Sequence, residues 1–127
     1  MGNVESLSPG VYKYNPEGHE LVKVRDGDVR EQLAVATLGQ TCVKEGTISI
    51  VIAAVYERTT GKYGERGVRY VHMEAGHTAQ NIYLQATALD LGMVTVGAFH
   101  DDRVKDIVGL SGNESPLYVI PVGRKKG

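Results

Sequence analysis

The chain has 127 residues and a formal net charge of −1 at pH 7, with 42% hydrophobic and 23% charged residues. This length and composition are typical of one globular domain with a core of its own, and we expect residues 1–127 to form it. The balanced charge argues against a nucleic-acid-binding protein, whose surface is usually basic. The basic run at 123–127 is expected to be a solvated end of the chain.

Cysteine usage and hydropathy restrict the chemistry and the location of the chain. The single cysteine, Cys42, excludes an internal disulfide and a cysteine-based metal cluster. The first ten residues lack the charged and apolar regions of a signal peptide. The longest apolar run, Ile48 to Tyr56, is too short to cross a bilayer as a helix. We therefore expect a cytoplasmic protein with no membrane partner.

The first third of the chain predicts a β-hairpin followed by a helix. Two runs of alternating polar and apolar residues flank the turn sequence Asn-Pro-Glu-Gly at 15–18. The two strands are expected at 11–14 and 19–25. Asp26 or Asp28 is the expected N-cap of the helix, and Gly39 is expected to end it. Its inward face is formed by Val29, Leu33 and Ala36.

The remaining elements are three strands and two helices. Residues 47–56 are β-branched and almost continuously apolar, which predicts a central strand buried on both faces. A long helix is expected over 68–91, with these apolar residues at helical spacing on one face: Val71, Ala75, Ala79, Ile82, Ala86 and Leu89. A buried strand over 93–99, a short helix over 100–110 and a last strand over 117–122 follow. This order favours an α+β or α/β sandwich with one sheet.

A segment dense in glycine and charge, residues 57–67, is expected to be a loop. Its Lys62-Tyr63 pair is a candidate for proton transfer, because three nearby arginines disfavour the charged form of Lys62. Tyr63 beside a cation can donate or relay a proton. The alternative is a solvated basic loop paired with the neighbouring glutamates, and residue types alone favour this alternative.

Other catalytic and metal-binding patterns receive no support from the sequence. Glu74 and His77 share a helix face, but a di-iron bundle needs two such pairs and further carboxylates. No metal is expected, and His77 is expected to be partly buried and hydrogen-bonded. The glycines at 61, 64 and 67 have neither the spacing nor the frame of a dinucleotide-binding loop. A nucleophile elbow is also missing.

Five segments carry a further pattern. They are residues 3–14, ERTTGKYGERGVRY at 57–70, EAGHTAQN at 74–81, VGAF at 96–99 and LYVIPVGR at 117–124. In this order, over nearly the whole chain, they resemble the SagB-type branch of the nitroreductase family. The resemblance implies an α+β nitroreductase-like fold, with a mostly antiparallel central sheet flanked by helices. The N-terminal part of that fold is missing from the chain.

The resemblance also implies a function and a set of site residues. It implies an FMN-dependent oxidoreductase that transfers hydride between a reduced nicotinamide or organic substrate and the flavin; the best-studied members of the branch oxidise azolines in peptides. Lys62 and Tyr63 match the Lys-Tyr pair of the branch and would remove a proton. The implied cofactor-binding residues are Val96, Gly97, Ala98 and Arg124. The first three match the strand end beside the flavin ring, and the arginine matches a cation on the FMN phosphate.

Partners follow from the same resemblance. It implies a homodimer with flavin at the interface, in which the small-residue face of the 68–91 helix is a dimer element. Members of the branch carry about as much chain again before the matched part. A second chain that supplies this half is therefore another implied partner. The alternative is a non-catalytic, half-length relative that acts as a dimeric binding or scaffold subunit.

Overall fold

The computed structural model describes residues 1–2 and 4–125. The expectations for residue 3 and for the last two residues of the basic tail lie outside this range. A three-stranded antiparallel sheet has the order β3-β5-β4, and a hairpin of β1 and β2 forms a separate sheet. The strands are β1 (Gly10–Asn15), β2 (Glu20–Asp26), β3 (Ile48–Ala54), β4 (Leu91–Met93) and β5 (Ser115–Arg124).

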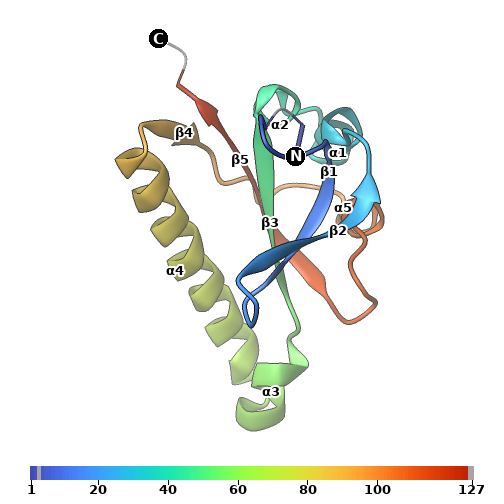
Figure 1. Ribbon diagram of the computed structural model, residues 1–127. Coiled ribbons are helices and arrows are strands. Elements are labelled where there is room, and N and C mark those ends of the chain that lie inside the picture. The colour runs from blue at the N-terminus through green and yellow to red at the C-terminus, as the bar shows by residue number, and fades with distance from the viewer. Residues whose placement is uncertain (3, 126–127) are drawn as a thin grey trace.

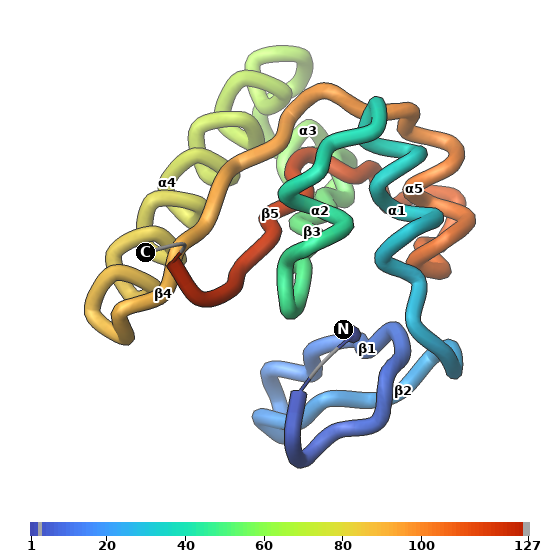
Figure 2. Tube along the Cα trace, turned by 90° about the horizontal axis from the view of Figure 1, so that it is seen from above, coloured from blue at the N-terminus to red at the C-terminus, as the bar shows by residue number. Residues whose placement is uncertain are grey.

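Five helices of the described part of the chain surround the three-stranded sheet, and they confirm the expected α+β class. They are α1 (Arg30–Ala36), α2 (Thr41–Glu45), α3 (Glu57–Tyr63), α4 (Arg66–Ala88) and α5 (Asp101–Val108). The long α4 lies along one face of the sheet, and α1, α2 and α5 lie on the other side (Figure 1). Seen from above, the hairpin is set apart from both layers (Figure 2). Among the described residues, no helix is long and apolar enough to span a bilayer.

The two faces of the sheet bury two different hydrophobic clusters. Because successive side chains of a strand point to opposite faces, Val119 and Ile120 of β5 belong to different clusters. Val119 packs with the residues of α1, α2 and α5, whereas Ile120 packs with Ala79 of α4. Both β5 side chains are completely buried. The core is therefore arranged around β5.

The strand expected at the centre of the sheet lies at its edge. Within the described sheet, β3 pairs with β5 on one side only, and each of its residues is half-buried. The central strand is β5, which extends two residues beyond the expected strand at each end. Pro116 and Pro121 both lie in this central strand, although proline cannot donate a ladder hydrogen bond. An apolar run does not reveal how many neighbouring strands it has.

The strand expected over 93–99 is much shorter. Met93 lies opposite Val122 and Val96 lies opposite Val119, so the two pairings share one register. Pro121 lies between these two pairings, opposite Val94, and has no N–H to donate to it. One hydrogen bond joins the two residues, from the Val94 N–H to the Pro121 carbonyl at 3.3 Å. The regular ladder stops at Met93 for this reason.

The segment expected to be a loop over 57–67 contains helix α3, a turn and the start of α4. Gly64 has a φ of +64°, which glycine adopts without steric cost, and its N–H donates to the Thr60 carbonyl at 2.7 Å. Gly67 is buried where α4 passes over α3. A short helix of this kind depends on tertiary contact more than on intrinsic propensity, which explains why composition alone gave the wrong prediction.

Helix α4 turns its expected apolar face toward the sheet. Its buried residues are Gly67, Val71, Ala75, Ala79 and Ala86. This small-residue face is therefore covered by the chain's own sheet and is not free to act as the expected dimer element. Leu89 lies beyond the helix and is 60% exposed, because Asp90 (φ +58°) rather than Gly92 ends the helical path. Gly92 instead pairs with Gly123 in the sheet.

The hairpin and α5 confirm the sequence predictions to within one or two residues. The N-cap of α1 is Val29, so the prediction of Asp26 or Asp28 at this position is wrong; Asp28 instead accepts a hydrogen bond from the Arg30 N–H at 3.0 Å. Gly39 (φ +73°) follows the end of α1. Val104 of α5 is completely buried, as expected. Helix α2 was not predicted. It has five residues, too few for helical periodicity to be recognised.

Two glycines of α4 provide a matched test of the α3–α4 contact. A Cβ on Gly67 would lie 3.0 Å from the Thr60 Cα and N atoms, whereas a Cβ on Gly76 would meet nothing within 4 Å. We expect Gly67→Ala to lower the free energy of unfolding by about 1–2 kcal/mol through overpacking. Gly76→Ala should raise it by about 1 kcal/mol through helix propensity. Urea denaturation measures both; equal changes of the same sign would contradict the described contact.

Candidate active site

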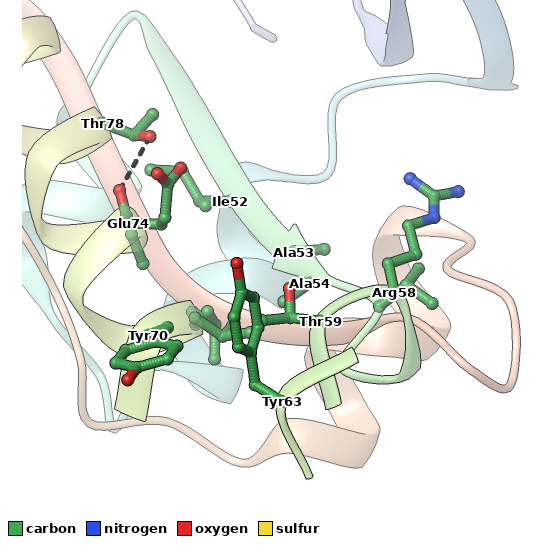
Figure 3. A pocket seen from close by; sticks show the side chains of 13 residues that line it. Ile52, Ala53, Ala54, Arg58, Thr59, Tyr63, Tyr70, Glu74 and Thr78 are labelled. Atoms are coloured by element: carbon green, nitrogen blue, oxygen red, sulfur yellow. Dashed lines mark hydrogen bonds between the residues drawn. The ribbon is translucent and has the colours of Figure 1, made fainter. Parts of the chain in front are cut away.

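A cleft of about 740 Å³ lies between the end of β3, helix α3 and the first half of α4. Its apolar part is formed by β3 and by the inward side of α4, with Leu117 from β5. Six lining residues have polar side chains: Arg58, Thr59, Tyr63, Tyr70, Glu74 and Thr78. Arg58 and Glu74 stand on opposite sides of the cleft, with Tyr63 between them and Tyr70 on the same side as Glu74 (Figure 3). The cleft thus combines an apolar wall with separated charges.

The Lys62-Tyr63 pair lies at the C-terminal end of α3, at the mouth of this cleft. Tyr63 lines the cleft and is 51% exposed, and the Lys62 Nζ lies 5.2 Å from the centre of its ring. This is cation–π distance. The rings of Tyr63 and Tyr70 of α4 meet edge to face, with ring centres 5.3 Å apart and planes at 87°. Lys62 itself does not line the cleft; its amine lies beside the ring of Tyr63, which does.

A second polar pair lies at the opposite end of α3. The Tyr56 hydroxyl lies 2.7 Å from Nε2 of His72, and the two rings meet edge to face. Burial raises the pKa of Tyr56 above its usual range, and the charge of Asp101 raises it further. Tyr56 therefore keeps its proton at neutral pH. Which partner donates depends on the tautomer of His72.

The residues expected beside the flavin ring follow the Val96 bridge. Val96 is buried, and its N–H and C=O both pair with Val119 at 2.9 Å. These two hydrogen bonds hold the backbone directly before Gly97 and Ala98 in place, and both of these residues are exposed. A Cβ at Gly97 would meet only Tyr118 Cε1, at 4.0 Å, so the space beside this backbone is open. An exposed, open glycine backbone fits the approach of a flat ring such as that of FMN.

The remaining expected cofactor residue lies elsewhere. Arg124 is exposed at the last position of β5, opposite Leu91. The first residue of β5, Ser115, pairs with Ala54, near the start of α3. A ten-residue strand is roughly 30 Å long, so β5 separates Arg124 from Lys62 and Tyr63. The single chain does not bring the expected catalytic and phosphate-binding residues together.

The Glu74-His77 pair has a different setting from the one expected. Both residues are exposed, so the prediction of a partly buried His77 is wrong. His77 lies on the solvent side of α4, between buried Ala75 and Ala79 in sequence but not on their face. Within the described residues, no three His, Cys, Asp or Glu side chains are grouped as metal ligands.

Sequence reasoning missed the contribution of Tyr70 and the Tyr56-His72 pair. Tyr63 and Tyr70 are seven residues apart on two different helices, so they meet only because the chain turns at Gly64. Reading the glycines of 57–67 as a helix–turn–helix would have brought them together. Tyr56 and His72 are separated by 16 residues, and no sequence period indicates their contact.

Comparison with solved structures defines the class of protein to which this fold belongs. The crystal structure of a "putative nitroreductase" from Anabaena variabilis has a TM-score of 0.90 and 33% identity, over 96% of this chain and 25% of that one. The E. coli microcin synthetase McbBCD complex, with truncated pro-MccB17 bound, has a TM-score of 0.80 over 100% of this chain and 49% of that one. At 24% identity, the second likeness shows the fold alone.

Sequence comparison then gives the family. Residues 3–124 match the nitroreductase family, and the chain belongs to that family, whose members are typically FMN-dependent oxidoreductases. "Putative nitroreductase MJ1384" of Methanocaldococcus jannaschii is 51% identical over 97% of this chain and 61% of its own length. "Trifolitoxin operon protein TfxC" of Rhizobium leguminosarum is 31% identical over 93% of this chain and 33% of its own length. The chain thus spans only part of the length of these relatives.

Proposed function

We propose that the chain is part of an FMN-dependent oxidoreductase of the SagB-type branch, which transfers hydride between the flavin and a reduced nicotinamide or organic substrate. The observation that carries the proposal is the Lys62-Tyr63 pair at the mouth of the α3–α4 cleft, in a chain of the nitroreductase family. The likeness to the trifolitoxin operon protein supports the branch. A peptide is the substrate class that this branch suggests.

The proposed chemistry divides the removal of two hydrogens between the chain and its cofactor. Oxidation of a substrate C–H bond releases a hydride and, from a neighbouring position, a proton. FMN, when bound, supplies the hydride acceptor. Lys62 and Tyr63 supply the proton acceptor: the amine beside the Tyr63 ring takes the proton directly or through the phenol. The apolar wall of the cleft would hold the substrate and exclude water.

The cofactor contacts would come from two places on the chain. Gly97 and Ala98 offer exposed backbone to the flavin ring, with Val96 fixing the strand end, and Arg124 offers a guanidinium to the phosphate. Because β5 separates Arg124 from Lys62, we propose that the working site is built from two chains. A homodimer or a second chain that carries the rest of the family fold would meet this need. A nicotinamide donor agrees with a cytoplasmic location.

The visible absorption spectrum and the mass of the purified protein test this proposal. We expect a yellow protein, or one that becomes yellow with added FMN, and a dimeric mass by light scattering. One FMN per chain would support the homodimer, and FMN uptake that requires a second chain would support the split site. A colourless protein that takes up no FMN in either setting would overturn the proposal and favour a non-catalytic binding or scaffold subunit.

Substitution of Lys62 tests the proton-transfer role. We expect Lys62→Ala to lower kcat by about 10²- to 10⁴-fold, the usual contribution of a positioned acid or base, while FMN affinity stays the same. Steady-state kinetics and FMN titration measure the two quantities. Lys44→Ala, at an exposed position of α2, is the control and should change neither. Equal loss of turnover and FMN binding would show that Lys62 is structural.

Substitution of Arg124 tests the phosphate contact. Loss of a hydrogen-bonded charge on a phosphate should raise the Kd for FMN about 10- to 100-fold in Arg124→Ala. Arg124→Lys should give an intermediate value, because lysine keeps the charge but not the bidentate geometry. Lys125→Ala removes the adjacent cation, which pairs with Asp90 at 3.3 Å, and is the control. Unchanged affinity in Arg124→Ala would remove this residue from the site.

A further inference from the structure

Helix α3 carries the Lys62-Tyr63 pair but has no anchor in the core. It has seven residues, none of them buried. A helix of this length is unstable alone, so its orientation depends on what it contacts. Its main neighbour is α4, which follows it after the turn at Gly64. The position of Lys62 and Tyr63 is therefore decided by the α3–α4 contact.

Three contacts along α3 define this junction. In the middle, the absence of a side chain on Gly67 lets α4 lie against the backbone of Thr59 and Thr60. At the C-terminal end, Tyr63 packs edge-on against Tyr70. At the N-terminal end, the Tyr56 hydroxyl and His72 Nε2 are 2.7 Å apart. The first contact is steric, and the second involves Tyr63, one member of the proposed catalytic pair.

The third contact is directional. Tyr56 is the N-cap of α3, and its carbonyl accepts hydrogen bonds from the N–H groups of Thr59 and Thr60. Its side chain therefore connects the first turn of α3 to α4. Among the described residues, no other side-chain hydrogen bond joins this corner to α4. The contact fixes the angle of α3 as well as its distance from α4.

We propose that Tyr56 and His72 are positioning residues, whose hydrogen bond sets the angle of α3 on α4 and so aims Lys62 and Tyr63 at the cleft. This role rests on the proposed function of Lys62-Tyr63. A phenol both donates and accepts, so either tautomer of His72 completes the bond. Tyr56 also remains protonated at neutral pH, because burial and the nearby Asp101 disfavour its ionised form.

Hydrogen exchange of the α3 amides tests the contact without reference to activity. Tyr56→Phe keeps the ring and removes the hydroxyl. We expect the amides of Thr60 and Gly64 to exchange about five- to tenfold faster in this variant. The Val119 amide, which bonds the Val96 carbonyl at 2.9 Å in the core, should exchange at the wild-type rate. In the FMN-loaded protein, kcat should fall while the Kd for FMN stays constant.

The chain contains a matched control. In the hairpin, the Tyr14 hydroxyl lies 2.7 Å from Nδ1 of His19. The ring centres are 5.7 Å apart and the ring planes are at 87°, against 5.7 Å and 86° for Tyr56 and His72. Tyr14→Phe should leave exchange in α3 unchanged. His72→Ala should speed exchange of the α3 amides as much as Tyr56→Phe does. Combining the two substitutions should speed it no further, because both remove the same hydrogen bond. His72→Gln should give exchange rates closer to those of the wild type than His72→Ala does.

The outcomes separate this inference from the proposed function. Unchanged α3 exchange in Tyr56→Phe, or equally faster exchange at Val119, would overturn the positioning role. Faster α3 exchange with unchanged kcat would also overturn it, because the angle of α3 would then not matter for turnover. If Lys62→Ala retains full turnover, the proposed function fails, whatever the exchange of α3 shows.

Discussion

The burial of β5 between two layers of helices is the constraint on which the rest of the structure depends. Val119 and Ile120 point to opposite faces, and both are completely buried. Burying a side chain of this size contributes about 1.5–3 kcal/mol. Since β3 and β4 both pair with this strand, one segment of ten residues positions the sheet, α4 and the opposite helical layer together.

The prolines of β5 shape both parts of the candidate site. Opposite Pro116 the register of β3 shifts between Ile52 and Ala53, just before the chain leaves the sheet for α3. On the other edge, Pro121 interrupts the ladder, so beyond β4 the chain is held to β5 by the Val94 N–H and by the Val96 bridge, and Gly97 and Ala98 then lie in an exposed segment. The two prolines of β5 thus interrupt the pairing of its neighbours close to the places where the chain leaves the sheet for the candidate site.

The candidate residues are separated in space, and the length of the family relatives bears on this separation. One chain holds the proposed proton-transfer pair beside a cleft, an open glycine backbone after the Val96 bridge and an arginine at the far end of β5. The matched relatives are longer than this chain. The proposed site, shared between two chains, would bring the dispersed residues together for the chemistry typical of the family.

The sequence by itself determined the features that depend on local periodicity. The hairpin turn, the inward face of α4 and the burial of Val104 in α5 follow from spacing within one element, and the resemblance to the family pointed to Lys62 and Tyr63. Tertiary structure alone decided which strand is central, because an apolar run does not specify its neighbours. It also decided that the glycine-rich segment contains a helix. That helix is stabilised by packing against α4 and by the contact between Tyr56 and His72, whose distance along the chain no local pattern encodes.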